Sequence, residues 1–477
     1  MNATMKKSLT GLISLSLAGL SLAAWPSAAQ QEATKKETPK EAPPPGGPPK
    51  AFTVPARETY TLPNGMQVTL VPYGNLPKVT VSLAIRAGNI NEPQGMPGLA
   101  DLMGRLMQEG TTSRSAQQIA EEAANMGGAL NIGVGPDESD VSIDVLSEFG
   151  AKAAALVADV AQHPSFPESE LPRLKNDALR ELAISKSVPQ NIALEKFRKV
   201  LYGDHPYGIV FPTQESIEKT TVEGIKRFYG DNIGAARAHL YVAGRFDEAA
   251  MKKAVEESFG KWEKGPEPVM DVPKVKPEHV LEVTDRPGAA QSTLYVGLPV
   301  PGATSPDNIQ LTVMNALLGG SFGSRITSNI REQKGYTYSP FSQISRRYHD
   351  AYWAEVADVT TKFTGPSLKE IFGEIERLQK EPPKEDELKG IETYLAGIFV
   401  IQNSSRGALI GQLRYVDLQG LGDDYLKTYV QRVNAVTPEE VQEMTKKYIK
   451  ADEMTIVVVG DKSKISDQLT AFEPAKQ

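Results

Sequence analysis

The chain has 477 residues, no cysteine and a formal net charge of −7. Without cysteine it has no disulfide, no thiolate metal ligand and no lipoprotein attachment site. The acidic balance argues against nucleic acid and anionic membrane as partners. The length suits two domains of ordinary size.

The first residues have the pattern of an export signal. Lys6 and Lys7 precede an apolar run over residues 9–24, and small residues follow at 27–29. The run is shorter than the ~20 residues of a membrane span, so we expect residues 1–29 to be a cleavable signal peptide, not an anchor. Export to the periplasm or secretion follows, with a charge of −9 once the two lysines are removed. Residues 30–56, rich in Pro, Lys and Glu, are expected to form a disordered linker.

The rest of the chain repeats itself. Thr221 and Thr437, each before a helical pattern, are 216 residues apart, and so are Gly244 and Gly460, each at the end of an apolar run. Matching offsets predict two copies of one unit, over residues 57–265 and 278–465. A segment rich in Pro, Lys and Glu near 264–276 is the expected hinge.

Each unit mixes strand and helix patterns. In the first unit we expect strands over 68–71, 79–86, 129–134, 140–145 and 238–243. Helices are expected over 96–108, 168–186 and 190–201. The fold class is therefore α+β, with two antiparallel sheets, each covered on one side by helices.

One stretch in the second unit, residues 319–338, reads GGSFGSRITSNIREQKGYTY. An apolar-faced helix is expected before it, capped by Ser305 and ended by Gly319 and Gly320, because glycine adopts the left-handed conformation freely. A second helical run, 324–332, is expected to end at Gly335, with a strand after it. Residue chemistry alone favours a helix–loop–helix–strand connection with ordinary caps.

The same stretch resembles the insulinase/pitrilysin family, and most closely its processing-peptidase branch. The matching motif residues are Gly319, Gly320, Ser324, Arg325, Ile326, Arg331, Glu332, Gly335 and Tyr338. The resemblance implies two similar α+β domains curved around a cavity. It also implies that Arg331 and Tyr338, beside the Gly319-Gly320 turn, hold the substrate or the transition state.

Residues 98–111 align with the zinc helix of that family, which carries His-x-x-Glu-His. Here Asp101 and Arg105 stand at the histidine positions and Gly104 at the glutamate position, while Glu181 matches the third ligand. An arginine repels zinc and a glycine offers no base. The five histidines, none within helical reach of another, do not replace the motif: His163, His205, His239, His279 and His349. We therefore expect no metal in this chain.

These observations favour a non-catalytic, substrate-binding subunit of a two-chain zinc metallopeptidase. The resemblance implies a partner of the same family that carries the zinc, and peptides as substrates. A peptide-binding or chaperone-like protein with no catalytic partner is the alternative, and an active protease with an unrecognised site is least favoured. Asp101, Arg105 and Glu181 are expected to form a buried charge cluster where relatives hold zinc.

Overall fold

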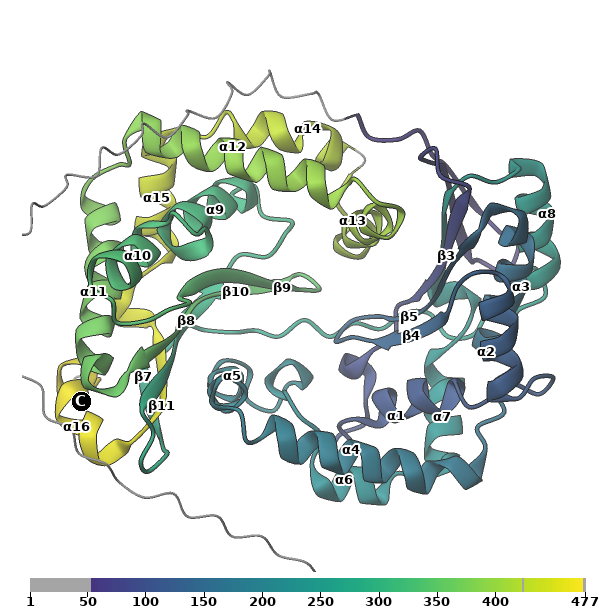
Figure 1. The fold of residues 1–477 in the computed structure, drawn as a ribbon, viewed down its shortest axis with the longest axis horizontal. Coiled ribbons are helices and arrows are strands. Elements are labelled where there is room, and N and C mark those ends of the chain that lie inside the picture. Colours follow the sequence, from purple (N-terminus) through teal and green to yellow (C-terminus); the bar gives the residue numbers. More distant parts are fainter. Residues whose placement is uncertain (1–52, 423, 475–477) are drawn as a thin grey trace, which may run out of the picture. The chain divides into compact units, whose positions relative to one another are not determined.

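The computed structural model describes residues 53–422 and 424–474. The predicted signal peptide and most of the predicted linker lie outside this part of the chain. Within it, the strands form one six-stranded and one five-stranded sheet. Helices accompany both sheets, so the predicted α+β class is confirmed (Figure 1).

The first sheet has the strand order β1-β2-β6-β3-β5-β4. Its strands are β1 (Glu58–Thr61), β2 (Gln67–Pro72), β3 (Lys78–Ile85), β4 (Leu130–Val134), β5 (Ser139–Leu146) and β6 (Ala238–Gly244). The helices along this half are α1 (Leu99–Met107), α2 (Ala116–Asn125), α3 (Gly150–Gln162), α4 (Leu171–Ser185), α5 (Pro189–Tyr202), α6 (Gln214–Lys219), α7 (Val222–Asn232) and α8 (Glu248–Phe259).

The second sheet has the order β7-β11-β8-β10-β9. Its strands are β7 (Val280–Asp285), β8 (Gln291–Val300), β9 (Phe341–Arg347), β10 (Asp350–Thr360) and β11 (Thr455–Gly460). The helices are α9 (Asn308–Asn315), α10 (Arg325–Thr327), α11 (Thr364–Lys380), α12 (Glu385–Gln402), α13 (Arg406–Gln419), α14 (Asp424–Val433), α15 (Pro438–Tyr448) and α16 (Lys462–Leu469).

The two sheets share one pairing scheme. In the first, β6 pairs parallel with β2 and antiparallel with β3, and β5 joins β3 to β4. In the second, β11 pairs parallel with β7 and antiparallel with β8, and β10 joins β8 to β9. The predicted antiparallel sheets are confirmed, and each also contains one parallel pair. The predicted domain limits remain a prediction.

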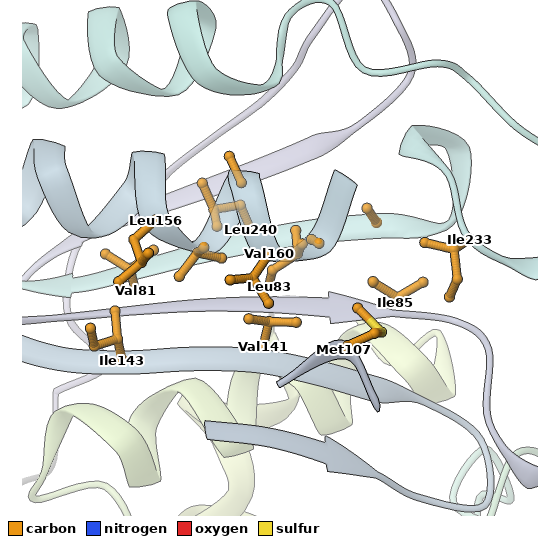
Figure 2. Close-up of a cluster of buried hydrophobic side chains, with 14 of the residues drawn as sticks. Val81, Leu83, Ile85, Met107, Val141, Ile143, Leu156, Val160, Ile233 and Leu240 are labelled. Carbon is orange, nitrogen blue, oxygen red and sulfur yellow. The ribbon is translucent and has the colours of Figure 1, made fainter. Parts of the chain in front are cut away.

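One face of the first sheet packs against the helices of its own half. Val81 and Leu83 of β3 and Leu240 of β6 meet Leu156 and Val160 of α3 in a cluster of fully buried side chains (Figure 2). Alternate residues of a strand point to the same face, so the apolar positions of β3 supply this core. This is the helical cover that the sequence predicts.

The other face of each sheet is covered by a helix from the opposite half. α13 packs on β3 and β6, where Leu409 and Leu413 join Val71 and Ala243 in one buried cluster (Figure 1). α5 packs on β8 and β11, and the ring of Phe197 lies 4.6 Å from that of Tyr295. The prediction that helices cover only one side of each sheet was therefore wrong, because the helix on the second side is distant in sequence.

Candidate functional site

Helix α1 keeps the packing of a core helix. Leu99, Leu102, Met103 and Leu106 are buried, in the i, i+3, i+4, i+7 pattern of a helix with one apolar face. Gly104 lies against the first sheet, and a Cβ added to it would lie 2.8 Å from Val134 Cγ2. A glutamate at this position therefore needs Val134 to move.

The start of α1 is held by a carboxylate from outside the helix. Glu92 accepts hydrogen bonds from the backbone N–H groups of Gly98 (3.0 Å) and Ala100 (2.9 Å), two donors that the first turn leaves unpaired. Burial raises the pKa of the Glu92 carboxyl to about 7, and the nearby charge of Asp101 adds to the shift. Glu92 was not predicted from the sequence, because it precedes the helix by seven residues and belongs to no capping motif.

The three charged residues at the expected zinc position come together, but not as predicted. Arg105 Nη2 lies 2.5 Å from Glu181 Oε2, and Nη1 lies 3.2 Å from Oε1, so the expected ion pair between α1 and α4 is present. Asp101 instead accepts a hydrogen bond from Asn89 Nδ2 at 2.8 Å, and burial raises its pKa. The expectation of a buried cluster was wrong: the Arg105 and Glu181 side chains are 35% and 53% exposed.

These side chains line a cavity of about 490 Å³. Its wall includes Glu92, Asp101, Arg105 and Glu181, together with Tyr207. Across residues 53–422 and 424–474, no group of three or more His, Asp or Glu side chains could hold a metal ion. Zinc needs three or four neutral or anionic donors, and Arg105 places a permanent positive charge at one ligand position. The residues present do not fit zinc.

The Gly319-Gly320 turn differs from the expected helix end. Both glycines belong to a π-helical turn over Ala316–Gly320 that continues α9, and neither has a positive φ. Ser305 does not cap α9, because its hydroxyl accepts from the backbone N–H of Asp307 just before the helix. A Cβ on Gly319 would lie 2.5 Å from Glu355 Oε2, so glycine is required here for close packing and not for a left-handed turn.

Arg331 and Tyr338 form part of one stack, in which the Arg331 side chain is 21% exposed and its Nε lies 3.4 Å from Glu332 Oε1. The Arg331 guanidinium lies 4.3 Å from the ring centre of Phe322 and 5.1 Å from that of Tyr338. Both rings face solvent, with exposed fractions of 71% and 80%. Gly335, with φ +64°, ends the helical run before Tyr338 as the sequence predicts. The strand expected directly after it begins later, at Phe341. Phe322 was not singled out in the sequence, although it lies in the same motif.

Models of known protein families match both halves of the chain. Residues 69–211 match the model described as insulinase (peptidase family M16), and residues 219–395 match that described as the peptidase M16 inactive domain. The chain belongs to peptidase family M16. This confirms the resemblance drawn from the two motifs.

M16 relatives cover most of the chain at low identity. A protein named uncharacterized zinc protease YmxG from Bacillus subtilis is 25% identical over 402 residues, which span 82% of this chain and 96% of that protein. A protein named non-peptidase homolog YmxG from Helicobacter pylori is 22% identical over 396 residues, 82% of this chain and 90% of that one. Proteins with both kinds of name therefore resemble this M16 chain.

Solved structures of two related proteins share the fold. A peptidase M16 inactive domain from Pseudomonas fluorescens has a TM-score of 0.78 at 25% identity and covers 85% of this chain and 98% of its own. A protease from Helicobacter pylori has a TM-score of 0.79 at 21% identity, with 86% and 100% covered. The inactive-domain match over residues 219–395 and the similarity to a protein named non-peptidase homolog point to a non-catalytic M16 chain. No helix in the described part of the chain is long and apolar enough to cross a membrane.

Proposed function

We propose that this chain is the non-catalytic, substrate-binding subunit of a two-chain zinc metallopeptidase that acts on peptides. A partner of the same family supplies the zinc helix and the general base. The observation that carries the proposal is the Arg105–Glu181 ion pair. It occupies the expected zinc position with a pair of opposite charges, while the buried face of α1 is kept intact. The helix has a packing role here and no chemistry of its own.

The substrate contact of this subunit is the Phe322–Arg331–Tyr338 stack. An arginine offers a permanently charged, planar donor fork, and a tyrosine offers a hydroxyl donor, both suited to a peptide carbonyl or its oxyanion. The two rings hold the guanidinium by cation–π contacts and stay exposed themselves. Gly319 and Gly320 position the loop that carries Phe322, because the π-helical turn packs closely on Glu355.

The location and partners follow from the sequence. Residues 1–29 direct the chain to the periplasm or out of the cell, where peptides are the substrates and neither nucleic acid nor a membrane anchor is involved. The zinc belongs to the partner. An acidic chain of this kind suits basic peptides better than acidic ones.

The test is reconstitution. The purified chain is mixed with an M16 protein of the same organism that keeps His-x-x-Glu-His, and cleavage of a peptide library is followed. The chain alone is expected to be inactive, and the mixture is expected to cleave faster than the partner alone. Peptide binding by the chain without any gain in cleavage would replace this proposal with the chaperone-like alternative.

A further inference from the structure

A second cavity, of about 280 Å³, lies where α13 meets the helices of its own half. Its lining is aromatic and polar, and consists of Thr312, Arg346, Phe399, Gln402, Gln412, Tyr415, Tyr425 and Tyr429. α9, α12, α13, α14 and β9 each contribute to it, and these elements lie close together in Figure 1. The volume is near the lower end of ligand sites, so it suits a single ring with a short substituent.

Arg346 places a positive charge at this cavity, and the side chains that accept its hydrogen bonds are neutral. Its Nε and Nη2 donate to Asn308 Oδ1 at 3.1 and 2.7 Å, and Nη2 also donates to Thr312 Oγ1 at 2.8 Å. Within the described ranges, no carboxylate lies within ion-pair distance of Arg346. Two other arginines, by contrast, are neutralised, since Arg325 pairs with Glu387 and Arg406 with Asp144. A guanidinium held in place by neutral groups keeps its charge available for an anion.

The aromatic side chains form the remaining wall. The rings of Phe399 and Tyr429 stack with their centres 4.5 Å apart, and Tyr425 lies 6.2 Å from Tyr415 and 6.0 Å from Tyr429. Asn308 Nδ2 reaches the Tyr425 hydroxyl at 3.4 Å, which links Arg346 to the rings. Burial raises the pKa of Tyr429 to about 12, and the charge of Arg346 opposes that shift. The Tyr429 hydroxyl is therefore a neutral donor at physiological pH.

We propose that this cavity binds a planar aromatic group that carries a carboxylate. The rings stack on the aromatic part, and Arg346 pairs with the carboxylate, with tyrosine hydroxyls and the amides of Gln402 and Gln412 as further donors. Two sources share this chemistry: the C-terminal aromatic residue of a peptide and a free aromatic acid. The site is separate from the Phe322–Arg331–Tyr338 stack and does not rest on the proposed subunit function.

The test is a titration of the full chain with 3-phenylpropionate and with its neutral amide, followed by calorimetry and by the melting temperature. We expect the acid to bind with a dissociation constant on the order of 1 mM or below and the amide at least about tenfold more weakly. Equal binding of acid and amide, or binding of neither up to about 10 mM, would overturn the proposal. A Phe-ending peptide with a free carboxyl group that binds better than 3-phenylpropionate and better than its amidated form identifies the peptide source, and the reverse order identifies the free acid.

Variants locate the site. Arg346→Gln removes the charge and is expected to weaken acid binding by about tenfold or more, with no effect on the amide. Gln412→Trp fills the cavity without touching the Arg346 hydrogen bonds and is expected to abolish binding, which keeps the test decisive if Arg346→Gln fails to fold. Arg286→Gln, at an exposed and distant position, is the matched control and keeps full affinity. Unchanged binding in folded Gln412→Trp would place the ligand elsewhere and contradict the proposal.

Discussion

Arg105 on α1 and Glu181 on α4 face each other, with Nη2 and Oε2 2.5 Å apart. In the family pattern these two positions belong to a zinc ligand and its partner ligand. Here the arginine supplies the positive charge that the metal supplies elsewhere, and Glu181 keeps a cationic neighbour. The ion pair therefore links α1 to α4 without a metal.

This substitution predicts that zinc binding can be restored. The Asp101→His, Arg105→His double variant places two imidazoles four residues apart beside Glu181, which completes a three-ligand set. We expect about one zinc per chain after dialysis, measured by mass spectrometry, and little in the parent chain. The triple variant that also carries Glu181→Ala is the control and is expected to lose the metal. A folded double variant without zinc would show that Glu181 does not occupy the third-ligand position.

The ion pair itself contributes little stability. Its side chains are 35% and 53% exposed, so Arg105→Ala is expected to lower the free energy of unfolding by only about 0.2–1 kcal/mol. Arg325 donates two hydrogen bonds to Glu387, and its side chain is only 10% exposed. Arg325→Ala is therefore expected to lower the free energy of unfolding clearly more than Arg105→Ala does. Urea denaturation of both variants tests this ranking. A larger loss for Arg105→Ala than for Arg325→Ala would contradict it.

Glu92 predicts a pH dependence of stability. Burial raises its pKa from the ordinary 4.5 to about 7 in the folded chain. Between these values the folded state holds a proton that the unfolded state has released, so stability falls as the pH rises from about 4.5 to about 7. Glu92→Gln removes the titrating carboxyl group. The difference in the free energy of unfolding between parent and variant is therefore expected to change by about 1–3 kcal/mol over that range. Urea denaturation at a series of pH values measures it, and a difference that does not change with pH would contradict the assignment.

The close packing of Gly319 predicts a position-specific effect. Gly319→Ala places a methyl group 2.5 Å from Glu355 Oε2 and 2.6 Å from Ser342 Oγ, so the turn must shift. We expect a loss of about 1–3 kcal/mol in the free energy of unfolding. Gly323→Ala, in the same loop with nothing within 4 Å of the added Cβ, is the matched control and is expected to be nearly neutral. Equal effects at both positions would show that the loss comes from chain flexibility and not from packing.

Local features of the fold could be predicted from the sequence. The hairpin expected at 129–134 and 140–145 appears as β4 and β5, because alternating apolar residues flank a Gly-Pro-Asp turn. The core face of α1 was likewise visible as a spacing of leucines and a methionine. In the candidate site, the contact between Arg105 and Glu181 followed from the family motif.

Other features depend on residues far apart in sequence. No local pattern shows that α13 covers β3 and β6, or that Glu92 caps α1, because each contact forms only when the chain has folded. In the sequence, the π-helical turn at Ala316–Gly320 has the pattern of an ordinary helix end at glycine. Only the folded structure shows that Glu355, in a distant strand, lies against it. The cavity beside Arg346 likewise draws its lining from five elements.

The most direct test of the account is the activity of the assembled pair with the double variant Arg331→Ala, Tyr338→Phe. If the stack contacts the substrate, turnover of peptides by the complex is expected to fall by about 10²–10³, while assembly and the zinc content of the partner stay unchanged. The Lys362→Ala variant, which removes an exposed cation–π contact on another loop, is the control and keeps full activity. Full activity of a correctly assembled double variant would contradict the claim that this chain binds substrate for a protease.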